Sequence, residues 1–261
     1  MCLILIAYRY QPGYPLLVAA NRDEFYNRPT APLAQWSDAS HIIAGRDLQS
    51  GGTWFGITTT GRFAALTNYR DPSRVLAKAP SRGKLVSDYL RCAEPARSYL
   101  DQVIKQADLY NGFNLLLGDS EGLFYYANYQ NQPRELKPGL YGLSNHFLDT
   151  PWPKVERART ALCQTLNQAT DPMPEDLLEL LHDQQPAPDH QLPHTGISLE
   201  WERWLSPIFI TAPGYGTRAS TALCVQDSGS VRIVETTWPD HSQQHLQTHW
   251  PPQTPGGGHS A

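Results

Sequence analysis

The sequence has few cysteines, no long hydrophobic run and no excess of basic charge. Its four cysteines lie far apart without a CxxC pair, which argues against a structural metal site and a disulfide framework. The first hydrophobic run, residues 1–7, is too short to span a membrane and lacks the basic segment that precedes a signal peptide core. A net charge of −4 without a basic run excludes nucleic acid as an expected partner. We therefore expect a soluble, cytoplasmic protein with no metal and no transmembrane segment.

What the sequence does have is a cysteine at its second position. Removal of Met1 would leave Cys2 with a thiol and a free α-amine on adjacent atoms. An α-amine titrates near pH 7.7–8.0 and a free thiol near about 8.5, so one residue would provide both nucleophile and base. The alternative is structural, because free cysteines are among the most buried residues.

Hydrophobic segments flanking turn residues predict antiparallel β-structure. Three hairpins are expected, from segments 2–8 with 15–20, 53–59 with 62–67, and 113–117 with 123–129. Helices are predicted over 81–92, 96–107, 154–167 and 174–183, and strands return at 207–211, 221–225 and 231–237. This order favours an α+β fold of antiparallel sheets covered by helices, as a single domain over residues 1–238. The polar, Pro- and Gly-rich residues 239–261 are expected to form a disordered tail.

Three further patterns are better explained by structure than by chemistry. Residues 118–122 match a GxSxG nucleophile motif, but a strand-like segment follows where that motif needs a helix, so a hairpin turn is expected. Gly51 and Gly52 lack the rest of a phosphate-binding loop and predict a tight turn beside a pocket. The histidines spaced by four, His241, His245 and His249, are assigned to the solvated tail rather than to metal or haem.

The segment from Asn21 to Glu24 ends the second predicted strand. The first hairpin brings it beside Cys2, so Arg22 would favour the thiolate, and an acid, either Asp23 or Glu24, would orient the amine. A solvated charged turn would explain the same residues.

Two asparagines also follow predicted strands. The side-chain amides of Asn68 and Asn145 can donate hydrogen bonds to a developing oxyanion, although each could equally cap a turn.

Together these motifs resemble the NRDE family, also called the transport and Golgi organisation family. The resemblance rests on the following stretches: Met1-Cys2, residues 20–24 with 28–29, 45–47 through 51–54, 67–70, 111–115, 143–145 and 215–221. It implies the N-terminal-nucleophile fold, a four-layer αββα sandwich, with Cys2 as nucleophile, Asn68 and Asn145 beside the oxyanion, and Arg218 as a late arginine. One departure from the similar bile-salt hydrolases is that Asp23 directly follows Arg22, where their acid comes three residues after the arginine.

Two functions therefore stand for testing. The first is an N-terminal-cysteine hydrolase of a non-peptide amide or a thioester, with Cys2, Arg22, Asp23, Asn68, Asn145 and Arg218 in the reaction. The second is a carrier in the same cleft, for which the resemblance implies haem as cargo, with an acyl-CoA or other lipid as the alternative ligand and no cofactor required. Asn21, Glu24, Trp54 and Tyr69 are the expected ligand-binding residues, with Trp36, Trp152 and Trp204 as further aromatic candidates. The oligomeric state is left open.

Overall fold

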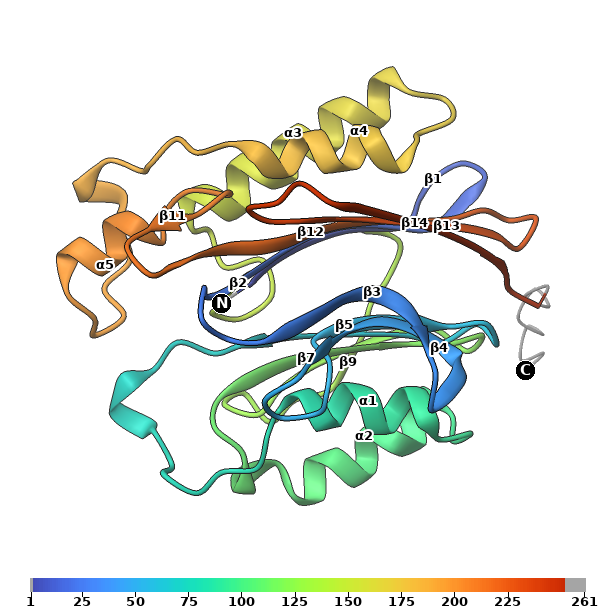
Figure 1. Cartoon of the computed structure of the whole chain (residues 1–261), viewed down its shortest axis with the longest axis horizontal. Helices are drawn as coiled ribbons and strands as arrows, with labels where there is room; N and C mark the ends of the chain where they lie inside the picture. Colours follow the sequence, from blue (N-terminus) through green and yellow to red (C-terminus); the bar gives the residue numbers. More distant parts are fainter. Residues whose placement is uncertain (1, 252–261) are drawn as a thin grey trace, which may run out of the picture.

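The computed structural model describes residues 2–251 as two β-sheets stacked face to face, with helices on both outer sides (Figure 1). The strand order of the first sheet is β10-β1-β2-β12-β13-β14, and β11 pairs with β12. The second sheet runs β3-β4-β5-β6-β7-β8-β9. All paired strands in both sheets are antiparallel, as expected for an αββα sandwich.

The bounds of these elements follow chain order. The first sheet contains β1 (Cys2–Gln11), β2 (Tyr14–Phe25), β10 (Gly139–Leu143), β11 (Thr211–Ala212), β12 (Tyr215–Val225), β13 (Ser230–Thr237) and β14 (Gln243–His249). The second contains β3 (Thr30–Trp36), β4 (Ala39–Asp47), β5 (Phe55–Thr58), β6 (Phe63–Asn68), β7 (Phe113–Gly118), β8 (Leu123–Ala127) and β9 (Arg134–Glu135). The helices are α1 (Gly83–Arg91), α2 (Ala96–Lys105), α3 (Pro153–Gln168), α4 (Pro174–Glu179) and α5 (Leu199–Trp204), with short 3₁₀ turns η1 (Pro72–Arg74), η2 (Ala107–Leu109), η3 (Leu180–His182) and η4 (Asp189–Gln191).

The three predicted hairpins are confirmed as β1–β2, β5–β6 and β7–β8. The first two turn at Gly13 and Gly61, which have φ values of 81° and 96° that suit glycine. The GxSxG pentapeptide forms the β7–β8 turn, so its reading as a turn is also confirmed.

The pleat of β1 divides its hydrophobic side chains between two cores. Ile4 and Ile6 point between the sheets, whereas Leu3 and Leu5 pack under α3 and α4. The neighbouring strand alternates in the same way, with Ala20 between the sheets and Ala19 toward the helices. Because side chains alternate along a strand, this register also decides where residues 21–24 of β2 point.

The second sheet is covered on its outer side by α1 and α2, below it in Figure 1. Leu85, Tyr89 and Leu100 are buried there and explain the helical spacing of hydrophobic residues in this part of the sequence. Within residues 2–251, no helix is both long and apolar enough to cross a membrane.

Two expectations from the sequence are wrong. Residues 207–210 are irregular, and only Thr211 begins the two-residue strand β11, because Ile208 and Ile210 pack into two different hydrophobic clusters instead of pairing in a ladder. The expected disordered tail includes β14, which pairs with β13 along its whole length, Gln243–His249, despite its polar composition. Residues 252–261 of that expected tail lie outside the described residues.

Trp250, directly after β14, packs and hydrogen-bonds against the second sheet. Its side chain is 4% exposed in the inter-sheet core, and its Nε1 donates a hydrogen bond of 2.7 Å to the carbonyl oxygen of Thr58. This contact joins the last strand of one sheet to the middle of the other.

We expect Trp250→Ala to lower the free energy of unfolding by about 3–5 kcal/mol, because it removes a large buried side chain. The exposed His245→Ala in the same region should change it by less than about 0.5 kcal/mol. Urea denaturation followed by circular dichroism measures both. Equal stability of the two variants would show that Trp250 does not pack against the second sheet.

Candidate functional site

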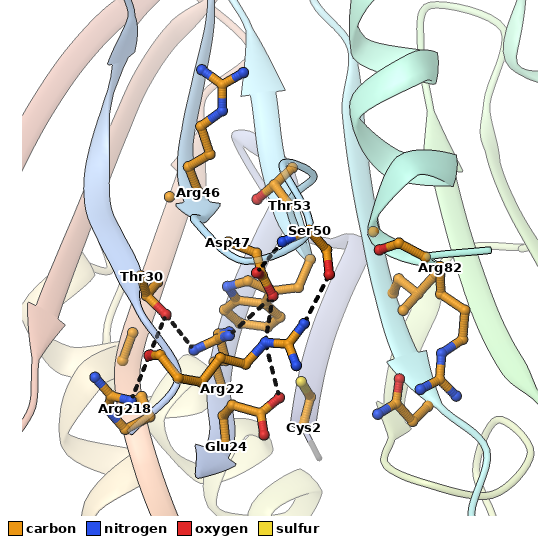
Figure 2. A pocket seen from close by; sticks show the side chains of 18 of the residues that line it. Cys2, Arg22, Glu24, Thr30, Arg46, Asp47, Ser50, Thr53, Arg82 and Arg218 are labelled. Carbon is orange, nitrogen blue, oxygen red and sulfur yellow. Dashed lines mark hydrogen bonds and ion pairs between the residues drawn. The ribbon is translucent and has the colours of Figure 1, made fainter. Parts of the chain in front are cut away.

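The space between the sheets opens at the start of β1 into a cleft of about 350 Å³. Residues that the sequence singled out line it from both sheets: Cys2, Arg22, Glu24, Trp54, Asn68 and Arg218. The loop containing Gly51 and Gly52 lies at its edge through Ser50 and Thr53, as expected for a turn beside a pocket. Figure 2 shows Cys2 near the centre of this cleft.

Cys2 faces the cleft because it shares the pleat parity of Ile4 and Ile6. It pairs with Arg22 across β1 and β2, so their side chains lie on the same face. Its backbone oxygen accepts a hydrogen bond of 3.0 Å from Ser144 Oγ, and only 7% of the residue is exposed. Burial raises the pKa of the Cys2 thiol, Asp23 raises it further, and Arg22 opposes both. The thiol therefore needs a nearby base to become a nucleophile.

Asp47 organises the arginines on one side of the cleft. Its Oδ2 lies 2.7 Å from Arg28 Nε and 3.8 Å from Arg22 Nη2 (Figure 2). Its Oδ1 accepts from the backbone N–H groups of Gln49 and Ser50. Burial disfavours the charge on Asp47, but these hydrogen bonds outweigh it and lower its pKa. The sequence contained the signal in Gly45-Arg46-Asp47, but gave Asp47 no role.

Arg218 enters the cleft through an irregularity in β12. The register with β2 shifts between Thr217 and Ala219, so Arg218 is the extra residue of a β-bulge. Its Nη1 donates to the backbone oxygens of Phe25, Tyr26 and Arg28 at 2.9, 3.1 and 3.2 Å. Arg218 thereby holds the chain that positions Arg28.

Asp23 borders the cleft, but its side chain lies on the opposite face of the sheet from Arg22. Its Oδ1 accepts a hydrogen bond of 2.8 Å from Thr217 Oγ1, and the residue is 1% exposed. The strongest charged partner opposing its burial is Lys154 from α3, which is 2% exposed. Burial raises the pKa of Asp23 and lowers that of Lys154 to about 8, and each favours the charged form of the other.

An ion pair lies near these two side chains. Arg70 Nη1 donates to Glu202 Oε2 at 2.7 Å, and both side chains are buried. Burial lowers the pKa of Arg70, and Glu202 and Asp23 oppose that shift. Residues from β2, α3, α5 and the end of β6 thus form one buried ionic cluster behind Cys2, none of which the sequence predicted beyond Asp23.

The two predicted asparagines occupy different positions. Asn68 lines the cleft at the end of β6. Asn145 is fully buried behind it, and its Nδ2 donates a hydrogen bond of 2.9 Å to the backbone oxygen of Asn68. Asn145 therefore joins the end of one sheet to the end of the other rather than facing the cleft.

Two of the predicted ligand-binding residues do not line the cleft. Asn21 has the pleat parity of Asp23, and its Nδ2 donates to the backbone oxygens of Leu181 and Ile208 under the helices. Tyr69 hydrogen-bonds His146 Nε2 at 2.7 Å within an aromatic cluster. Of the aromatic candidates, only Trp54 borders the cleft, because the other tryptophans pack elsewhere: Trp36, Trp152 and Trp204.

A second, more hydrophobic groove of about 840 Å³ adjoins the cleft at Arg218, which lines both. Trp238 is its centre, with ring centroids 5.4 Å from His182, 5.0 Å from Phe209 and 4.6 Å from His241. Burial lowers the pKa of His182 and so favours its neutral imidazole. Within the described chain, no cluster of three or more acidic, histidine or cysteine side chains is arranged to hold a metal ion.

Two stacked antiparallel sheets, with helices on both outer sides and a cysteine at the start of an inner strand, define a protein of the αββα class. The chain belongs to the Transport and Golgi organisation 2 family, whose model matches residues 1–240. This confirms the family predicted from the sequence motifs.

Similar proteins cover nearly the whole chain. The human Transport and Golgi organization protein 2 homolog is 34% identical over an alignment of 273 positions. The alignment covers 95% of this chain and 97% of the human protein. The Drosophila melanogaster protein is 27% identical, over 91% of this chain and 92% of its own.

Two solved structures are also similar. A Caenorhabditis elegans ortholog of N-acylethanolamine-hydrolyzing acid amidase has a TM-score of 0.47 and 11% identity, covering 85% of this chain and 92% of its own. A mutant conjugated bile acid hydrolase from Clostridium perfringens has a TM-score of 0.45 and 10% identity, covering 94% and 92%.

We expect Lys154→Met to lower the free energy of unfolding at pH 8 by about 3–5 kcal/mol, because it leaves the buried Asp23 carboxylate without its main counter-charge. Adding Asp23→Asn should recover part of this loss, since the double variant removes both charges. The exposed Lys137→Met is the matched control, with an effect below about 0.5 kcal/mol.

The deficit of Lys154→Met should shrink as the pH falls from 8 to 5. A buried carboxyl with a raised pKa binds its proton more tightly in the folded than in the unfolded state, so acid favours the folded variant. Chemical denaturation at each pH measures this. A deficit that stays constant with pH, or a double variant no more stable than Lys154→Met, would contradict the pairing.

Proposed function

We propose that the protein hydrolyses a non-peptide amide or a thioester, with Cys2 as the nucleophile. The observation that carries the proposal is the position of the Cys2 side chain, in a cleft between two sheets and directly opposite Arg22. A cysteine that served only packing would suit the hydrophobic core that holds Ile4 and Ile6. Instead, charged and polar groups surround this one.

The reaction proceeds in two steps after removal of Met1. The α-amine of Cys2 takes the thiol proton, the sulfur attacks the substrate carbonyl carbon, and a C–S bond forms. The C–N or C–S bond of the substrate then breaks, and the amine or thiol leaves with that proton. Water attacks the acyl-enzyme with the α-amine as base, releases the carboxylic acid and regenerates the thiol.

The surrounding residues take distinct roles in this mechanism. Arg22 stabilises the thiolate, because it is the cation paired with Cys2 across the strands. Asn68 donates to the developing oxyanion from the opposite sheet, and Asn145 positions it. Asp23 rather than Glu24 orients the amine, since Glu24 is already bonded to the Phe25 N–H and lies 3.8 Å from Arg28 Nε.

We expect Cys2→Ala to abolish the acyl adduct that amide or thioester probes form on wild type. Intact mass spectrometry of natively expressed protein measures both the adduct and the removal of Met1. Cys92→Ser is the matched control, because Cys92 does not line this cleft and should leave labelling unchanged. Retention of Met1, or the absence of an adduct on processed protein, would contradict the hydrolase.

The hydrophobic groove at Trp238 supports a second candidate function, carriage of haem or of an acyl-CoA or other lipid. Its aromatic lining and the neutral His182 suit an apolar ligand better than the arginine-lined cleft, where the carrier was first expected. A ligand in this groove would lie beside Arg218 rather than on Cys2.

If the carrier function holds, haemin should bind wild type and Cys2→Ala alike, as measured by absorption titration. His182→Gln with His241→Gln should weaken binding at least tenfold, whereas His190→Gln, in an exposed 3₁₀ turn, should not. The same titration with palmitoyl-CoA, followed by tryptophan fluorescence, separates the lipid ligand from haem. No saturable binding of either ligand would exclude the carrier.

A further inference from the structure

Five arginines line the cleft, and four of them have several partners among the described residues. Arg22 and Arg28 share Asp47, Arg46 makes two hydrogen bonds to Asp38, and Arg218 bonds three backbone oxygens. Arg82 differs from these. Its single side-chain hydrogen bond within residues 2–251 runs from Nη1 to the backbone oxygen of Gly112 at 2.9 Å, and its side chain has no carboxylate partner there.

Arg82 lines the cleft from the side opposite Arg218. It directly precedes α1 on the side of the second sheet, and Figure 2 shows it across Cys2 from Arg218. Burial lowers its pKa, and the fields of Cys2 and Glu24 oppose that shift, which places the guanidinium within electrostatic range of both. Gly112, whose backbone oxygen accepts the hydrogen bond from Arg82, is tightly packed, because a Cβ at this position would lie 2.9 Å from the Cβ of Tyr69.

The carboxylates nearest the cleft are engaged elsewhere. Glu24 is bonded to the Phe25 N–H and paired with Arg28. Glu235 accepts hydrogen bonds from the Leu33 N–H at 2.7 Å and from Thr221 Oγ1 at 3.1 Å, and burial raises its pKa. Asp47 is occupied by two other arginines. A half-buried guanidinium with one hydrogen bond therefore has unused donors directed at the cleft.

We propose that Arg82 binds an anionic group, a carboxylate or a phosphate, on the molecule whose carbonyl Cys2 attacks. The planar guanidinium can offer two parallel N–H donors to such an anion, which is the geometry that arginine provides and lysine does not. This inference rests on the proposed hydrolase function and narrows its substrates to amides or thioesters with a negative charge near the scissile bond. A neutral lipid amide would leave Arg82 without an anionic partner.

The test uses two pairs of thioester probes that differ in one charge. S-succinyl-N-acetylcysteamine and its monomethyl ester differ in a carboxylate on the acyl group. S-acetyl-3-mercaptopropionate and its methyl ester differ in a carboxylate on the leaving thiol. The rate of probe hydrolysis is measured by chromatography, and the adduct on Cys2 by intact mass. A separate calorimetric titration with succinate or inorganic phosphate measures anion binding without turnover.

Wild type should hydrolyse the anionic member of one pair at least tenfold faster than its ester. The pair that shows this preference indicates on which side of the scissile bond the anion lies. In Arg82→Gln, the hydrolysis rate should fall at least tenfold with that anionic probe and less than threefold with its ester. Arg82→Lys should retain part of the preference for the anionic probe. Arg74→Gln, on the exposed η1 turn, is the matched control and should behave as wild type.

The outcomes separate the two proposals. Reaction with all probes but no charge preference overturns the role of Arg82 and leaves the hydrolase intact. An equal loss with charged and neutral probes in Arg82→Gln also overturns it, because Arg82 would then act in the reaction itself. If no probe reacts, thioester hydrolysis fails, and loss of anion binding in Arg82→Gln but not in Arg74→Gln would still support the anion site. Absence of anion binding by wild type overturns the role of Arg82.

Discussion

The pleat of β2 divides four consecutive polar residues between the two faces of one sheet, and the site depends on that division. Arg22 and Glu24 point into the cleft with Cys2, while Asn21 and Asp23 point toward the helices. A shift of one residue in the β1–β2 register would exchange these sets. The register is held by the hydrophobic residues of both strands, which alternate between the inter-sheet core and the helix-covered core. Core packing far from the cleft thus decides which charges meet the thiol.

The two faces balance charge in different ways. On the cleft side, arginines share Asp47 or bond to backbone oxygens, and the space remains open to a ligand. On the helix side, Asp23 and Lys154 lie beside the Arg70–Glu202 pair, nearly fully buried. Such pairs contribute little net stability when intact but are costly when broken. Their position directly behind the first strand suits them to hold its start in place.

Three side chains connect the two sheets by hydrogen bonds. Asn145 bonds the backbone of Asn68, Glu235 bonds the backbone of β3, and Trp250 bonds the backbone of β5. Each contact runs from the side of one sheet to the other sheet. A cleft bounded by such contacts is largely formed before a ligand enters, which reduces the cost of ordering on binding.

The sequence by itself determined the hairpins, most of the helices, the family and the position of Cys2 at the start of the first strand, because these follow from local hydrophobic spacing, turn residues and motifs. It also brought Arg22 near Cys2, since a tight hairpin leaves few registers. It could not assign a face to Asn21 or Asp23, recognise the polar strand β14, or find Lys154, Asp47 and Arg82 as neighbours of the site. Those depend on contacts between segments far apart in the chain, and only the stacking of the two sheets between their helices brings such segments together.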